Sequence, residues 1–109
     1  MSVHKGQVVS VRIIPIEQGR PPGKLADAEV IFEADAGPLL SGLKLSGFAV
    51  WERRDGGKNV TVPARPYVAN GARRSFVLLR PTSKDTNAQD PLRQCILEAY
   101  DSQETHATE

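Results

Sequence analysis

Cysteine, histidine and long apolar runs are scarce in this sequence of 109 residues, and each scarcity excludes a class of protein. The single cysteine, Cys95, rules out an intramolecular disulfide. No apolar run approaches the roughly 18 residues that a membrane span needs. No long apolar segment follows the first charges of the chain, as a secretory signal would require. We therefore expect a cytoplasmic protein without a membrane partner.

Residue patterns that support catalysis or metal binding are also missing. The two histidines, His4 and His106, lie in terminal segments, where a general base is not held rigidly. With one cysteine they offer no zinc-ligand spacing. The glycines form neither a GxGxxG nor a P-loop pattern. The sequence therefore predicts no enzyme activity, no cofactor, no metal and no small-molecule substrate; an enzyme would need a polar cleft that nothing here indicates.

Charge is strongly segregated, although the whole chain has a net charge of only +1. Residues 53 to 84 contain eight basic side chains and one acidic, a net charge of +7, whereas residues 85 to 109 contain one basic and six acidic, a net charge of −5. Such asymmetry indicates an electrostatic partner for the basic segment. In the alternative, which stays open here, the acidic C-terminal segment folds over the basic loops and neutralises them internally.

Period-two patterns predict about five strands. Residues 7 to 16 place Val9, Val11 and Ile13 on one face, and residues 25 to 33 place Ala26, Ala28, Val30 and Phe32 on one face and acidic residues on the other. Further strands are expected within residues 39 to 51, 58 to 63 and 75 to 80. Gly42 and Gly47 indicate bulges or close backbone approaches. Pro15 places the first strand at a sheet edge or marks its end.

Turn and helix signals complete the predicted fold. Asp55-Gly56-Gly57 and Asn70-Gly71 are turn signals, and residues 64 to 70 are predicted to be a proline-containing connection. Asp90-Pro91 is typical of a helix start, followed by an apolar stripe of Leu92, Cys95, Ile96, Ala99 and Tyr100. The predicted fold is α+β, with a mostly antiparallel sheet and one C-terminal helix in a single domain over residues 1–101, and a polar, acidic, disordered tail over residues 102–109. On this stripe, Cys95 is expected to be a buried structural thiol.

Basic residues interleaved with aromatic ones point to nucleic acid. Arginine and lysine neutralise phosphates, and exposed aromatic rings stack on unpaired bases. We expect Tyr67, in a proline-rich segment, to be exposed, whereas Trp51 and Phe76 lie in apolar strands and are expected in the core. The alternative, a solvated rim of arginines with no ligand, stays open. The predicted nucleic-acid-binding residues are Arg53, Arg54, Lys58, Arg65, Tyr67, Arg73 and Arg74.

Residues from about 25 to 101 also resemble the stage V sporulation protein G (SpoVG) family. The resemblance rests on the strand Gly47–Trp51, the charged turn at residues 53 to 57, the proline-bearing segment at 60 to 66, and the helix ending Ile96-Leu97-Glu98-Ala99-Tyr100. It implies a small α+β fold, a homodimer formed by strand pairing, and DNA or RNA binding in bacterial regulation.

The sequence departs from that family's pattern in two places. Glu52 and Arg53 stand where the family usually has Pro and Ser. Gln89, Asp90 and Pro91 stand just before the helix, where the family tends to have basic residues tied to DNA contact. Because of the second departure, we expect nucleic acid to contact the hairpin arginines and Arg73-Arg74 instead. The leading hypothesis is a nucleic-acid-binding regulator; the second is a protein–protein interaction module that uses its basic loops or an exposed sheet edge.

Overall fold

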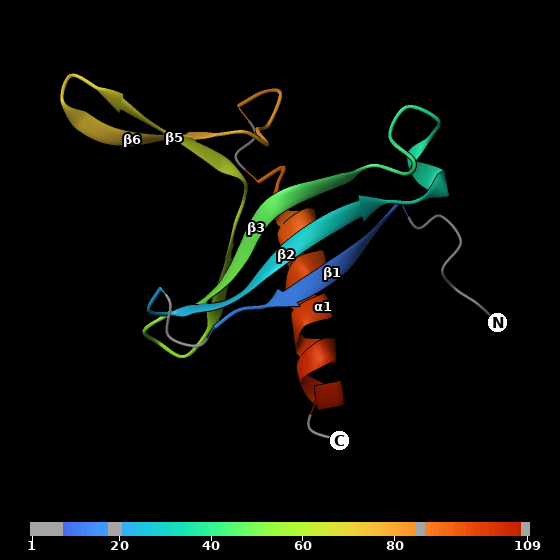
Figure 1. Ribbon diagram of the computed structural model, residues 1–109. Helices are drawn as coiled ribbons and strands as arrows, with labels where there is room; N and C mark the ends of the chain where they lie inside the picture. Colours follow the sequence, from blue (N-terminus) through green and yellow to red (C-terminus); the bar gives the residue numbers. More distant parts are fainter. Residues whose placement is uncertain (1–7, 18–20, 85–86, 108–109) are drawn as a thin grey trace.

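The computed structural model describes residues 8–17, 21–84 and 87–107, with side chains described as far as residue 103. Gln7, His4 and the last two tail residues lie outside the described residues, and so does the side chain of His106. The fold is α+β, as the sequence predicts (Figure 1). Its elements are β1 (Val9–Pro15), β2 (Lys24–Phe32), the 3-10 helix η1 (Ala34–Ala36), β3 (Lys44–Glu52), β4 (Lys58–Thr61), β5 (Ala64–Ala69), β6 (Ala72–Val77) and α1 (Asp90–Ala107).

The body of the protein is a four-stranded antiparallel sheet in the order β1-β2-β3-β4. β2 lies in its interior and follows the predicted alternation, since Ala26, Ala28 and Val30 are buried on one face. The opposite face of β2 carries Asp27 and Glu29, which stay near solvent. This is the pattern of a sheet that is covered on one side only.

Helix α1 covers the apolar face of the sheet (Figure 1). Ile96 is fully buried against Phe48, Val50 and Val60, which belong to the core cluster. Burial of such side chains is the main stabilising contribution in a domain of this size. The packing of α1 therefore stabilises the four-stranded sheet, and this sheet positions the β3–β4 turn and the β5–β6 hairpin.

Two predictions about α1 need correction. Cys95 is exposed, because the inward stripe is formed by Leu92, Ile96 and Tyr100 together with Leu97, and this places Cys95 outside the stripe. The helix also runs to Ala107, past Ser102, where we expected a tail without fixed structure. The acidic segment is thus helical over most of its length. Within the described residues, no helix combines the length and the apolarity that a membrane crossing requires.

Gly47 produces a bulge in β3. The pairing of β2 with β3 shifts register between Ala28 and Glu29, opposite this glycine. Gly47 has φ +108°, and a Cβ placed there would lie 3.1 Å from the Cβ of Pro63. A glycine is needed both for the positive φ and for this close approach. Gly42 was expected to be a similar bulge but lies in the turn before β3.

Residues 64 to 69, predicted to be an irregular connection, form strand β5 and pair with β6 in a separate two-stranded sheet. Asn70 and Gly71 have φ values of 52° and 76°, the two positive values that a tight type I′ hairpin turn requires. Pro66 is tolerated because β5 is an edge strand, where a missing N–H does not interrupt a ladder. The described residues therefore form six strands, where about five were predicted.

The β5–β6 hairpin, residues 64 to 78, is called the arm below. It projects away from the helix and from the four-stranded sheet (Figure 1). The extensive packing contacts of β5 and β6 are with each other, and every arm residue except Ala69 is exposed. A two-stranded hairpin without a covering layer is only marginally stable in water. The arm therefore leaves most of its surface open to solvent.

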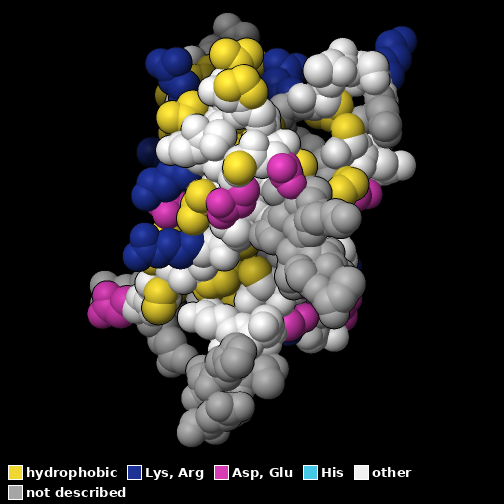
Figure 2. Space-filling view, turned by 90° about the vertical axis from the view of Figure 1, so that its right-hand side faces the viewer, with side chains coloured by type: hydrophobic (Ala, Val, Ile, Leu, Met, Phe, Trp, Pro, Cys, Tyr) yellow, Lys and Arg dark blue, Asp and Glu magenta, His cyan; other side chains and the backbone are white. Residues whose placement is uncertain are grey.

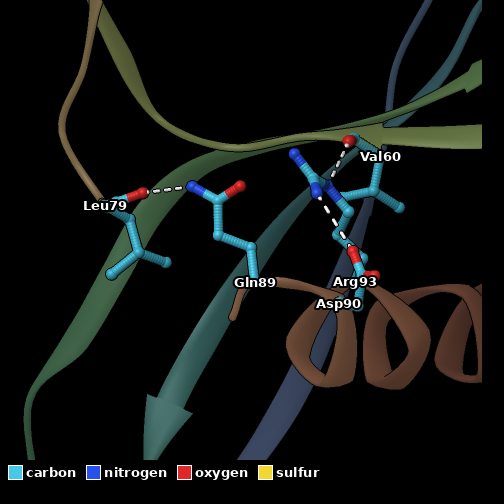
Figure 3. Close-up of polar contacts among 5 residues, drawn as sticks. All are labelled: Val60, Leu79, Gln89, Asp90 and Arg93. Carbon is cyan, nitrogen blue, oxygen red and sulfur yellow. Dashed lines mark hydrogen bonds and ion pairs between the residues drawn. The ribbon is translucent and has the colours of Figure 1, made fainter. Parts of the chain in front are cut away.

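The base of the arm is held by the start of α1 (Figure 3). The Gln89 side-chain amide donates to the carbonyl of Leu79, just after the arm. Arg93 Nε donates to the carbonyl of Val60, 3.2 Å away on β4, and Arg93 Nη1 lies 3.4 Å from Asp90 Oδ1. The Leu78 N–H also donates to the Pro63 carbonyl at 2.9 Å. The Gln89–Leu79 and Leu78–Pro63 bonds hold the end of the arm against the body, and the Arg93 bonds hold α1 against β4 beside it.

Candidate nucleic-acid interface

The predicted binding residues fall into two groups rather than one surface. Arg53, Arg54 and Lys58 belong to the β3–β4 turn, whereas the other four lie on the arm: Arg65, Tyr67, Arg73 and Arg74. Figure 1 shows the turn and the arm at opposite ends of the chain segment that contains β4. The six residue steps from Lys58 to Ala64 span up to roughly 20 Å of extended chain. The two groups therefore lie on separate elements, at the two ends of this segment.

The turn follows its sequence signal closely. The Arg53 N–H donates to the Gly57 carbonyl at 2.7 Å, and the Gly56 N–H donates to the Arg53 carbonyl at 3.0 Å. Asp55 Oδ1 accepts from the Gly57 N–H at 2.9 Å, as aspartate does in tight turns. The turn holds its arginines at the end of the four-stranded sheet.

Acidic neighbours already engage most of the charge at this turn. Lys58 Nζ lies 3.6 Å from Asp101 Oδ1 on α1 and 5.8 Å from the centre of the Tyr100 ring. Arg53 Nη2 lies 3.4 Å from Asp55 Oδ2. The acidic C-terminal segment therefore does neutralise one basic residue of the turn, because Asp101 on α1 pairs with Lys58. Arg54 alone among the three forms no ion pair within the described residues.

The arm has no such compensation. Its arginines, Arg65, Arg73 and Arg74, form no ion pair among the described residues. No aspartate or glutamate occurs in the sequence between Asp55 and Asp85. By contrast, the side of the molecule in Figure 2 shows Lys and Arg side chains next to Asp and Glu side chains. The positive charge of the arm is therefore free to attract an anionic partner.

The arm also exposes apolar side chains. Nine large hydrophobic residues are exposed within the described part of the chain, and five of them lie on the arm: Tyr67, Val68, Phe76, Val77 and Leu78. Scattered single residues of this kind need no explanation, but a concentration on one protruding element marks an interaction surface. Tyr67 is exposed, as the sequence predicted.

The predicted core positions of Phe76 and Trp51 are wrong. Phe76 is 46% exposed on the arm, although the run Phe76–Leu79 is as apolar as a core strand. Trp51 is half-buried on the face of the sheet away from α1, where its Nε1–H donates to Thr61 Oγ1 at 2.9 Å and Lys24 Nζ lies 6.0 Å from the ring centre. Burial depends on a covering layer, and the arm has none. The aromatic content of the arm is therefore larger than the sequence suggested.

Phe76, Leu78 and Arg80 are the arm-associated residues that sequence reasoning did not select. Arg80 lies two residues beyond the arm, with its guanidinium carbon 4.7 Å from the centre of the Phe76 ring. An Asn-Gly pair with strand-like residues on both sides is a strong hairpin signal. It would have predicted β5 if the two prolines had not favoured a loop; the exposure of Phe76 depends on the missing covering layer and has no local signal.

The pKa of the Glu29 carboxyl is perturbed by its neighbours. This residue lies on the face of the sheet away from α1, and the hydrogen bond from Ser46 Oγ at 2.9 Å lowers the pKa of its carboxyl below the usual 4.5. Lys44, whose Nζ is 3.3 Å from Glu29 Oε1, lowers this pKa further. This cluster is a local ion pair with a hydroxyl donor beside it. In the described part of the chain, no group of three or more His, Cys, Asp or Glu side chains is placed to bind a metal ion.

Comparisons with known proteins return no match: no family model, no curated protein and no solved structure is similar to this chain.

Proposed function

We propose that this protein binds nucleic acid through the arm. The observation that supports this proposal is the combination, on one protruding hairpin, of three arginines without ion pairs, exposed aromatic side chains and no acidic residue. Arginine contacts with phosphate supply most sequence-independent affinity for nucleic acids. The bonds at the base of the arm hold its end against the body.

The turn residues take a lesser part in this proposal. Lys58 and Arg53 are already paired with carboxylates, so binding a phosphate there would first require breaking an ion pair. Exposed ion pairs are weak, about 0 to 1 kcal/mol, so this cost is small but is absent at Arg73 and Arg74. The two arginine pairs, Arg53-Arg54 and Arg73-Arg74, thus form a matched comparison.

The test is a fluorescence-anisotropy titration of short DNA and RNA oligonucleotides, single- and double-stranded, at several salt concentrations. The Arg73→Ala/Arg74→Ala variant should bind more weakly. The slope of log affinity against log salt should fall by about 0.7 to 0.9 for each phosphate that the variant no longer neutralises. The Arg53→Ala/Arg54→Ala variant removes the same charge and should change affinity less.

Three results would contradict the proposal. The first is that the wild-type protein binds none of the oligonucleotides at low salt. The second is that the Arg73→Ala/Arg74→Ala variant binds as the wild type does, which would remove the arm from the interface. A larger loss of affinity for Arg53→Ala/Arg54→Ala than for the arm variant would move the site to the turn.

We further propose a homodimer formed by strand pairing at β6. Within the described residues β6 has β5 as its only neighbour, and its outer edge contains no proline. An exposed edge of this kind pairs readily with another strand, and two copies of β6 related by a twofold axis would form an antiparallel pair. Sedimentation equilibrium should give twice the chain mass of 11.9 kDa; a monomer at all concentrations would contradict this.

The same free edge favours a second candidate function, a protein–protein interaction module that captures a strand of another protein by β-augmentation. In that case the titrations would show no nucleic-acid binding.

The proposal also includes membership of the SpoVG family, which the sequence resemblance implies, and a cytoplasmic location. The location is supported by the exposed, unpaired thiol of Cys95, since extracellular domains of this size often rely on disulfides.

A further inference from the structure

The two faces of the arm differ in chemistry. The register pairs Arg65 with Phe76 and Tyr67 with Arg74. Because side chains alternate along a strand, these four residues share one face, which is called the aromatic face below. The opposite face carries Pro66 paired with Ser75 and Val68 paired with Arg73.

The aromatic face has a groove of about 480 Å³ lined by Arg65, Tyr67, Phe76 and Leu78. Tyr67 and Phe76 are diagonal neighbours across the strand pair, close enough for both rings to meet one ligand. They are 43% and 46% exposed, so substantial ring surface is open to solvent. The groove is thus walled by rings and by the stem of an arginine.

Arginines flank the rings on several sides. Arg65 and Arg74 stand directly opposite Phe76 and Tyr67 on the partner strand. Arg80 packs its guanidinium against the Phe76 ring, with the guanidinium carbon 4.7 Å from the ring centre, which orders both side chains. Flat apolar surfaces bordered by positive charge match a ligand with flat rings on an anionic backbone.

We infer that the aromatic face binds single-stranded nucleic acid, with unpaired bases stacked on Tyr67 and Phe76 and phosphates held by Arg65 and Arg74. This inference rests on the proposed nucleic-acid binding and specifies its ligand. In a duplex the faces of the bases are already stacked on each other, so exposed rings find only base edges and phosphates. In a single strand the faces are available, and aromatic side chains stack on them with little dependence on sequence. DNA and RNA strands share this chemistry.

The direct test uses the wild-type protein and three DNA probes that differ in one property each. They are a single-stranded 12-mer, the same strand with abasic sites in place of most bases, and the corresponding duplex; a single-stranded RNA 12-mer serves as the fourth probe. The abasic strand keeps the phosphates and lacks the stacking surfaces. Since each stacked base contributes about 5- to 150-fold in affinity, the intact single strands should bind at least about fivefold tighter than the abasic strand, and tighter than the duplex.

Variants locate the effect on one face. Phe76→Tyr keeps an aromatic ring and should retain the preference for the intact strand over the abasic strand. Phe76→Leu keeps an apolar side chain without a ring and should reduce that preference. Arg74→Ala should weaken binding more than Arg73→Ala, because Arg73 lies on the opposite face. Circular dichroism and unfolding curves of each variant confirm that the body remains folded.

The outcomes separate this inference from the proposed function. Equal affinity for intact and abasic strands, or tighter binding of the duplex, would overturn the stacking inference while leaving nucleic-acid binding by the arm in place. No binding of any probe would overturn both. If Phe76→Leu leaves the ratio of intact to abasic affinity unchanged and instead converts a dimer to a monomer in sedimentation, the aromatic face is a self-association surface and the inference is wrong.

Discussion

The arm and the body should respond very differently to the same substitution at a phenylalanine. Phe48 is fully buried in the core cluster beneath α1. Phe48→Ala removes the transfer free energy of the ring and leaves a cavity in close-packed surroundings. Such substitutions lower the free energy of unfolding by about 3–5 kcal/mol. For a domain with a typical stability of about 5–15 kcal/mol, this is a large fraction of the total.

Phe76→Ala should cost much less. The residue is 46% exposed, so about half of its surface leaves water on folding. Full burial of such a ring contributes about 1.5–3 kcal/mol, which gives roughly 1–1.5 kcal/mol here. The exposed cation–π contact with Arg80 adds about 0.5–1 kcal/mol. No enclosed cavity forms, since the groove beside the ring is open. The expected loss of stability is therefore about 1.5–2.5 kcal/mol.

Urea unfolding followed by far-ultraviolet circular dichroism measures both losses as changes in the transition midpoint. The Phe48→Ala midpoint should fall well below that of Phe76→Ala. Equal losses at the two positions would refute the view that the arm stands apart from the core. They would indicate that Phe76 is covered in solution, for example by a second copy of the chain.

Two further predictions concern the body. Gly47→Ala should lower the free energy of unfolding by about 1–3 kcal/mol, because it forces a side chain into a positive-φ conformation against Pro63. Gly56→Ala is the control and should cost less, because Gly56 has φ +92° but nothing lies within 4 Å of the new Cβ. Equal losses for the two variants in the same urea assay would contradict the argument. Because the folded-state pKa of Glu29 is lowered, its contribution to stability is fully present above about pH 4.5 and is lost as the pH falls through the folded-state pKa. Ser46→Ala removes the largest cause and should raise the pKa of Glu29 toward its usual value in a carbon-detected NMR titration; an unchanged pKa would show that the Ser46 hydrogen bond is not its cause.

The body of the fold could be predicted from the sequence because its strands obey a simple pattern. Ala26, Ala28 and Val30 alternate with polar residues and are buried together, and the Asp55-Gly56-Gly57 turn forms where its glycines indicate. In each case a local preference and the burial of one face favour the same structure. Where the local preference of a segment and its burial in the fold agree in this way, the sequence pattern predicts the structure.

The arm could not be predicted in the same way, because nothing local distinguishes a protruding strand from a buried one. The run Phe76–Leu79 is apolar on both faces, and the presence of a covering helix decides whether such a run is buried. The prolines at 63 and 66 indicated a loop, although Pro66 is accommodated on an edge strand. Cys95 shows the same limit, since a small rotation of the apolar stripe placed it in solvent.

The division of the basic segment also depends on the three-dimensional structure. The charge count shows that residues 53 to 84 are basic, but it does not show that Lys58 meets Asp101 across the body while Arg73 and Arg74 meet no acidic residue among those described. Long-range pairing is set by where α1 packs. Of the seven residues predicted to bind, four therefore lie on the arm, and the three at the turn are separated from them.

The most direct test of arm binding is an NMR titration of the isotope-labelled protein, whose mass of 11.9 kDa suits amide-resolved spectra. A single-stranded oligonucleotide is added stepwise while the amide shifts of every assigned residue are followed. Binding through the arm predicts shifts concentrated in residues 64 to 80 and little change at residues 53 to 58. Shifts concentrated at the β3–β4 turn or on the four-stranded sheet, with the arm unaffected, would contradict it.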